Sequence, residues 1–198
     1  MKNLNYPLTI KFKFGVINPQ FSVVDAGGLP VAFVKQKAFK LKEDISVFRG
    51  EAQTDLRFKI KADRWLDYNA SYSFTDAGGK DCGRLVRKGR KSLWKAEYEL
   101  YDENDKPDLV IKEANGWVKV VDHFLGEIPI LGMFTGYFLN PSYNVTRPNG
   151  TQVATLHKKP DLVSRAFELE KNATFEEGEE TRLVLGIMMM VLLERARG

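Results

Sequence analysis

Apolar and polar residues alternate along most of this 198-residue chain. In segments 10–14 and 57–61, for example, isoleucine and phenylalanine alternate with lysine and arginine. A period of two places successive side chains on opposite faces of a β-strand, so each segment predicts a strand with an apolar inner face and a basic outer face. About a dozen such segments precede residue 170, which predicts a mainly β protein.

Part of this pattern repeats. FSVVDAGGLPVAFVKQK begins at Phe21 and YSFTDAGGKDCGRLVRKG begins at Tyr72, and both place an aromatic residue and a short β-forming run before Asp-Ala-Gly-Gly. YNVTRPNGTQVATLHKK, from Tyr143, retains the aromatic residue and a turn glycine, whereas YELYDENDKPDLVIKE, from Tyr98, fills the turn with acidic residues. A repeated unit of strand, turn and strand predicts a series of β-hairpins.

The repeated turns have a simple chemistry. Glycine adopts the positive φ values that tight turns require, and an aspartate can accept hydrogen bonds from the turn backbone. The turn positions are Gly27-Gly28, Gly78-Gly79 and Asn149-Gly150, and the capping residues are Asp25 and Asp76. A glycine loop that holds phosphate would need a following helix and a motif such as GxGxxG, but β-rich sequence follows and the motif is missing.

The apolar run LVLGIMMMVLL, residues 183–193, predicts a helix enclosed by protein. A helix that crosses a bilayer needs about 20 predominantly apolar residues, roughly twice the length of this run. Apolar residues occupy every face of the helical wheel, so the helix must be buried. A sheet of about twelve strands with one apolar face can close into a barrel, and this helix would fill its lumen. We therefore predict a single domain, residues 1–198, with a central helix that begins near Glu180 or Thr181.

Residues 116–138 do not follow the strand pattern. Apolar residues recur at helical spacing before Pro129, which predicts a short helical insertion around 116–128. This helix either packs as core over one mouth of the barrel or presents an interface for a second copy, a protein partner or a membrane. The residues of such an interface would be Trp117, Val121, Phe124, Ile128 and Phe134.

Together, these features resemble the tubby C-terminal-like superfamily, which includes tubby proteins, phospholipid scramblases and LURP-one-related proteins. The resemblance rests on the strand-Asp-x-x-Gly-strand units at 21–34 and 72–86, on the run VAFVKQKAFKLKEDISVF and on the closing helix at 181–196. It implies a twelve-stranded barrel around a central helix. Members of the superfamily variously bind phosphoinositides, associate with membranes or have no established activity. The stretch EKNATFEEGEE corresponds to the segment where scramblases are credited with a calcium site; it is acidic but lacks an alternating aspartate spacing, so the sequence assigns no metal ligands there and leaves a calcium site open.

Lysine and arginine gather in two stretches, 35–42 and 80–95. If the barrel brings these stretches together, their outward side chains would form a patch able to bind a phosphorylated headgroup or an anionic membrane. The predicted ligand-binding residues are Lys35, Lys37, Lys40, Arg84, Arg87, Lys88, Arg90 and Lys91. The alternative is a pair of ordinary solvated hairpins. Aromatic residues do not interleave with the cluster, so we do not expect a groove for single-stranded nucleic acid.

The composition narrows the range of functions that we expect for this protein. The net charge of +4 permits an anionic partner without requiring one. Cys82 is the only cysteine, which excludes an internal disulfide and a cysteine-rich zinc site. His123 and His157 lie far apart and outside metal-ligand motifs, and no nucleophile elbow is present. We therefore expect a non-enzymatic binding module without cofactor or metal. Because the first residues lack an apolar core like that of a signal peptide, we expect a cytoplasmic protein that can associate with membranes peripherally, without a transmembrane span.

Overall fold

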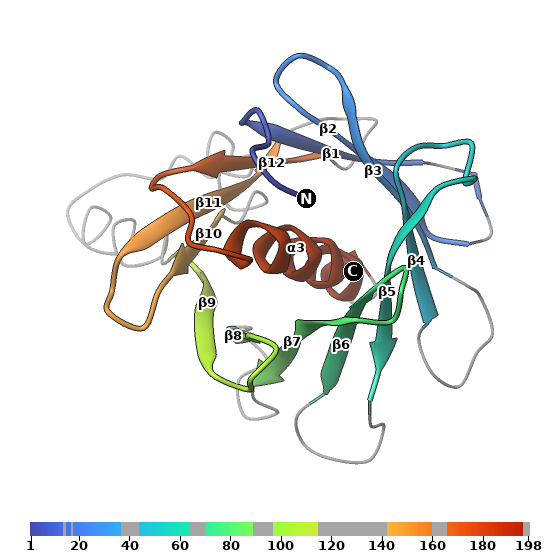
Figure 1. Ribbon diagram of the computed structural model, residues 1–198. Helices are drawn as coiled ribbons and strands as arrows, with labels where there is room; N and C mark the ends of the chain where they lie inside the picture. The colour runs from blue at the N-terminus through green and yellow to red at the C-terminus, as the bar shows by residue number, and fades with distance from the viewer. Residues whose placement is uncertain are drawn as a thin grey trace, which may run out of the picture.

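The computed structural model describes residues 1–13, 15–16, 18–36, 44–63, 70–88, 97–114, 142–159 and 166–195. Within these ranges the chain forms twelve β-strands and one helix, α3 (Glu179–Arg195), as Figure 1 shows. The strands are β1 (Leu8–Phe12), β2 (Gln20–Val24), β3 (Pro30–Gln36), β4 (Asp44–Phe48), β5 (Leu56–Ala62), β6 (Ser71–Asp76), β7 (Asp81–Lys88), β8 (Glu97–Tyr101), β9 (Pro107–Glu113), β10 (Ser142–Thr146), β11 (Gln152–Lys159) and β12 (Ala166–Lys171).

The strands close into an antiparallel barrel. Each pairs with its neighbours in sequence, and β1 pairs with both β2 and β12, so that Ile10 lies opposite Val23 on one side and Phe167 on the other. Closure leaves none of the twelve described strands with an unpaired edge, which removes the usual template for aggregation. The structure confirms the predicted barrel of about twelve strands around a C-terminal helix.

Alternation along each strand separates the core from the outer wall. On β5, Phe58 and Ile60 are buried, whereas Arg57 and Lys61 are exposed. The buried side chains of the twelve strands surround α3, which passes through the lumen in Figure 1. Every residue of α3 from Arg182 to Leu193 is buried, because the barrel encloses the helix on all sides.

The predicted turns are present and use the predicted chemistry. Oδ1 of Asp25 accepts hydrogen bonds from the backbone N–H groups of Gly27 and Leu29, at 2.9 and 2.8 Å, and Asp76 caps the next repeat in the same way. In the acidic repeat, Asp102 is the cap and Asp105 takes the left-handed conformation, with φ of 61°. A register shift precedes each of these turns, and such bulges increase the local twist that closure requires.

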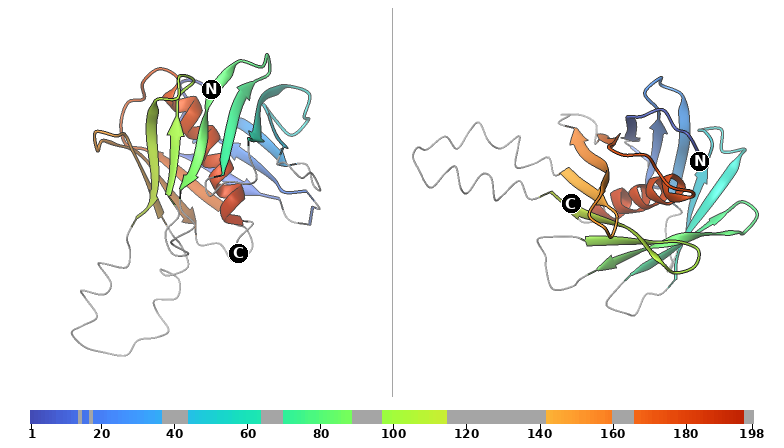
Figure 2. Two further views of the ribbon diagram at one scale, coloured as in Figure 1. Left: turned by 90° about the horizontal axis from the view of Figure 1, so that it is seen from below. Right: turned by 60° about the vertical axis from the view of Figure 1, so that its left-hand side comes forward.

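The barrel has two different mouths. The tight turns that lead into β3, β5, β7, β9 and β11 surround the mouth at which α3 begins, and those same strands end around the mouth at which α3 ends. Figure 2 shows the helix running between the two mouths. We call the first the turn mouth and the second the distal mouth.

The helix predicted around 116–128, with the interface residues Trp117, Val121, Phe124, Ile128 and Phe134, lies outside the described residues and stays a prediction. In the described part of the chain, no helix combines the length and apolar character needed to cross a membrane.

Candidate functional site

The structure places four of the eight predicted ligand-binding residues. Lys35 lies on β3, and Arg84, Arg87 and Lys88 lie on β7. The other four, Lys37, Lys40, Arg90 and Lys91, lie outside the described residues. Strands β3 and β7 are not neighbours, because β4, β5 and β6 separate them in the barrel wall. The two stretches therefore form one surface only if the intervening strands are basic as well.

Strand β5 supplies the missing basic residues. The register places Lys35 opposite Ser46 on β4, and Ser46 opposite Lys59 on β5. Two residues further along β5, Lys61 lies opposite Ser73 on β6, which in turn faces Arg84 on β7. Adjacent strands lie about 4.8 Å apart, so each row holds two basic residues about 10 Å apart with a hydroxyl between them.

The alternating pattern of β5 predicts an outward basic face that includes Lys59 and Lys61, but it does not assign them to the candidate site. The alternation RFKIK was the available signal. It shows that both lysines point outward, but it does not show that β5 lies midway between β3 and β7, because that depends on how the barrel closes.

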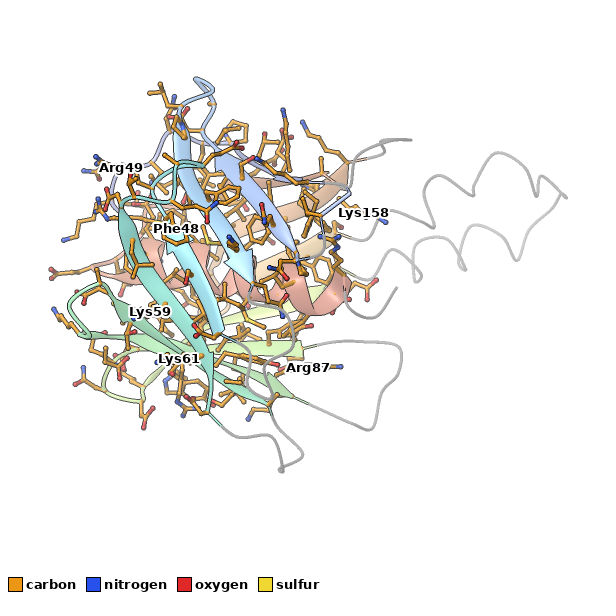
Figure 3. The ribbon with its side chains drawn as sticks, turned by 90° about the vertical axis from the view of Figure 1, so that its right-hand side faces the viewer. Phe48, Arg49, Lys59, Lys61, Arg87 and Lys158 are labelled. Atoms are coloured by element: carbon orange, nitrogen blue, oxygen red, sulfur yellow. The ribbon has the colours of Figure 1, made fainter. Side chains whose placement is uncertain are left out.

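We call Lys35, Lys59, Lys61 and Arg87 the basic sector. Within the described part of the chain, no carboxylate lies within ion-pair distance of any of them, and the Nζ of Lys35 donates only to the neutral Oε1 of Gln53, at 3.1 Å. Figure 3 shows Lys59 and Lys61 on β5 and Arg87 toward the end of β7. The positive charge of the basic sector is therefore available to an external partner.

Arg84 and Arg87 differ from the expectation that both point freely outward. Nε of Arg84 donates to Asp105, at 2.8 Å, and its guanidinium stacks on the ring of Tyr101, 4.3 Å from the centroid. Arg87 lies opposite Tyr98, whose side chain is in the core, so Arg87 is on the lumen-facing side at the distal mouth. Arg84 is thus already engaged, whereas Arg87 belongs to the rim of the mouth.

Several other lysines of the wall are paired with carboxylates. Lys88 pairs with Glu99 at 3.0 Å, and Lys112 pairs with Glu97 at 3.3 Å, both across neighbouring strands. The hydrogen bond to Glu99 raises the pKa of Lys88. Lys159 forms a further ion pair with Glu168 between β11 and β12. These strands therefore differ from the basic sector in the pairing of their lysines with carboxylates as well as in the number of lysines.

A second concave region lies at the turn mouth. A hollow of about 460 Å³ is lined by residues of both signs, among them Arg57, Asp76, Cys82, Glu103 and Arg182. Burial raises the pKa of the Cys82 thiol, which keeps it protonated at neutral pH and a weak nucleophile. In the described ranges, His, Cys, Asp and Glu do not gather into a group that could hold a metal ion.

Charged residues at the turn mouth attach the helix to the wall. Nε and Nη2 of Arg147 each donate to a carboxylate oxygen of Glu179 at 2.7 Å. Arg182 donates to Asp108 at 2.6 Å and to Glu103 at 3.1 Å. Because these groups satisfy one another, they hold the first turn of α3 in place and leave little free charge for a ligand.

The comparison with protein families agrees with this architecture. A model of the LURP-one-related family matches residues 30–191. The chain belongs to the LURP-one-related family. The match confirms the resemblance drawn from the repeated hairpins and the closing helix, and it spans the strands that carry the basic sector. Searches of curated proteins and of solved structures find no significant match.

Proposed function

We propose that this LURP-one-related barrel is a non-catalytic binding module that associates with anionic phospholipid surfaces through the basic sector. The observation that carries the proposal is the set of unneutralised side chains on β3, β5 and β7, whereas Lys88, Lys112 and Lys159 elsewhere on the wall are paired with carboxylates. A lysine or arginine near an anionic bilayer contributes about 1 kcal/mol of binding free energy, so a few such residues give reversible association. In this role the protein contacts the membrane surface and stays peripheral to it.

The arrangement also suits phosphorylated headgroups. In one cross-strand row the hydroxyl of Ser46 lies between two unneutralised residues, Lys35 and Lys59. In the other row Ser73 lies beside Lys61, and Arg84 on its far side is already bound to Asp105. A phosphate accepts charge-assisted hydrogen bonds from lysine and further bonds from hydroxyl groups. Headgroups that carry additional phosphates are therefore expected to bind more tightly than those with one.

Co-sedimentation with liposomes tests the proposal. The wild-type protein should sediment with liposomes that contain phosphatidylserine or a phosphoinositide, and remain in the supernatant with neutral phosphatidylcholine liposomes. The double variant Lys59→Glu/Lys61→Glu should lose the anionic binding, because it replaces two unneutralised cations of the basic sector with anions.

A matched control separates local charge from net charge. Lys80 and Lys106 lie in turns at the turn mouth, and Lys80→Glu/Lys106→Glu changes the net charge by the same amount, from +4 to 0 in each double variant (+4 − 2×2). The control should retain most of the binding. Equal loss of binding in both double variants would contradict a defined site. If the wild-type protein did not bind, the lipid proposal would be rejected and the predicted protein interface at residues 116–138 would be tested next.

A further inference from the structure

The turn between β4 and β5, residues 49–55, folds back over the outer wall of the barrel. It follows β4 directly, yet two of its side chains reach other parts of the wall. Nζ of Lys13, directly after β1, donates to Oε2 of Glu51 at 2.7 Å, and Nζ of Lys35 on β3 donates to Oε1 of Gln53 at 3.1 Å. The contacts of the turn therefore extend across β3 and β2, which lie between β4 and β1.

A buried aromatic residue lies beneath this turn. Phe33 lies between Ala32 and Val34 on β3, whose side chains belong to the core, so the ring of Phe33 points to the outer face. Phe33 is nevertheless only 1% exposed. Nζ of Lys13, which is bound to the turn, lies 5.1 Å from the centre of this ring, and Phe48, labelled in Figure 3, is the cross-strand neighbour on β4. An outward ring stays buried only if something covers it, and the turn together with Lys13 provides that cover.

Both lysines that the turn binds belong to one row of the wall. The backbone N–H of Lys13 donates to the carbonyl oxygen of Gln20, and Gln20 lies opposite Lys35. The row continues through Ser46 to Lys59, which has no carboxylate within ion-pair distance in the described part of the chain. The turn therefore occupies two of the three lysines in the row that the proposed headgroup site uses.

The acceptors that the turn offers resemble those of a phosphate. A carboxylate oxygen and an amide oxygen each accept a hydrogen bond from Nζ of a lysine, as a phosphate oxygen does. A headgroup that binds Lys13 and Lys35 must therefore displace Glu51 and Gln53. The side chains of Lys13 and Glu51 are 38% and 58% exposed, and solvent-exposed ion pairs are weak, so a headgroup can displace this contact.

We infer that the β4–β5 turn is an autoinhibitory cover, in which Glu51 and Gln53 occupy Lys13 and Lys35 in the place of a lipid headgroup. The inference rests on the proposed function and adds a regulatory contact to it. When only a fraction of the molecules has the cover displaced, the apparent affinity for the ligand falls by that fraction. Changes that weaken the cover should therefore strengthen binding to anionic liposomes.

An uncharged substitution gives the first test. Gln53 has φ of 56°, a left-handed conformation that asparagine tolerates, and Gln53→Asn shortens the side chain by one methylene, so that it no longer reaches Nζ of Lys35 from the present backbone position. Titration with liposomes of phosphatidylcholine and phosphatidylserine, followed by co-sedimentation, gives the lipid concentration for half-maximal binding. We expect this concentration to fall about twofold or more for Gln53→Asn. Because the net charge is unchanged, the gain reports the release of Lys35.

Removal of a charge gives the second test. Glu51→Gln removes the carboxylate that binds Lys13. Asp25→Asn is the matched control, because it raises the net charge equally and its amide oxygen can still cap the β2–β3 turn. We expect Glu51→Gln to lower the half-maximal lipid concentration about two- to fivefold, and Asp25→Asn to lower it less. In a Lys13→Gln background the advantage of Glu51→Gln over Asp25→Asn should disappear, because no lysine remains to be released.

The outcomes separate the autoinhibitory cover from the proposed function. If the wild-type protein binds but Gln53→Asn gives no gain, or Glu51→Gln and Asp25→Asn give equal gains, the cover is overturned and the proposed function stands. If neither the wild-type protein nor any variant sediments with the anionic liposomes, both are overturned.

Discussion

At the scale of single residues, two glycines determine how closely α3 approaches the wall. A Cβ atom added to Gly83 would lie 2.2 Å from the carbonyl oxygen of Tyr101. A Cβ atom added to Gly186 would lie 2.6 Å from Cδ2 of Leu100. Real Cβ atoms do not approach other heavy atoms so closely, so a side chain at either position must displace its neighbour. Leu100 can move because it is a side chain, whereas the carbonyl of Tyr101 belongs to the ladder between β7 and β8.

Replacement of Gly83 by alanine should therefore be strongly destabilising. Gly83 also has φ of +101°, a conformation that residues with a side chain rarely adopt. We expect Gly83→Ala to lower the free energy of unfolding by about 3 kcal/mol or more, measured by urea denaturation. Gly50→Ala is the control, because a Cβ there meets open space. Equal stability of the two variants would contradict the close contact.

Asp102 makes a pH-dependent contribution to stability. Hydrogen bonds from the backbone N–H groups of Lys106 and Asn104 lower the pKa of this carboxyl below its usual 3.8. A lowered pKa means that the contribution is present above the usual pKa and is lost as pH falls through the folded-state pKa.

Asp102→Ala should therefore cost about 1 kcal/mol at pH 7, as expected for lost turn hydrogen bonds, and the difference from wild type should shrink toward acid pH. Denaturant unfolding at a series of pH values measures the difference. Asp102→Asn retains an acceptor oxygen and should cost less at pH 7. A difference from wild type that stayed constant with pH would rule out the charged cap.

At the scale of elements, α3 is both the core and the closing segment of the barrel. Its apolar centre fills the lumen, and its first turn is tied to the wall through Glu179 and Arg182. Acidic residues at the start and Arg195 in the last turn also complement the helix dipole. The strands alone would enclose an empty lumen, so barrel and helix are expected to fold together.

The central position of the helix predicts a severe effect of a buried charge. Met189 is fully buried, and Met189→Asp would place a carboxylate among apolar side chains without a partner. We expect this variant to fail to fold, as judged by circular dichroism and solubility. Met189→Leu, which conserves the volume, should fold with a cost below about 1.5 kcal/mol. A soluble, folded aspartate variant would show that the lumen does not enclose the helix.

At the scale of the whole molecule, the arrangement of charge matters more than its sum. A net charge of +4 is modest for 198 residues, but Lys35, Lys59 and Lys61 have no carboxylate within ion-pair distance in the described part of the chain. Charge that is not neutralised locally attracts a protein to an oppositely charged surface, within the range that salt permits.

Binding to anionic liposomes should accordingly weaken as salt rises, because screening shortens the range of the attraction. Titration of liposomes at low and physiological salt should give a clear decrease in affinity for wild type and for Lys80→Glu/Lys106→Glu. The Lys59→Glu/Lys61→Glu variant should show little binding at either salt concentration. Wild-type binding that did not change with salt would point to apolar insertion rather than charge.

The amino-acid sequence by itself determined the elements and the closure of the fold, because the signals involved are local. Period-two alternation specified strands with one apolar face, Asp-x-x-Gly specified the turns that Asp25 and Asp76 cap, and eleven apolar residues, 183–193, specified a helix that had to be enclosed. These patterns lie within a few residues of one another, so sequence reasoning recovers them and the family match agrees.

Only the tertiary structure decided which charges share a surface. Lys35 and Arg84 belong to strands that three others separate, and the barrel register placed Lys59 and Lys61 between them. It also turned Arg87 toward the mouth and paired Lys88 with Glu99. Pairing and neutralisation depend on strands distant in sequence, and the alternation within one strand shows which face a lysine takes but not which residue it meets.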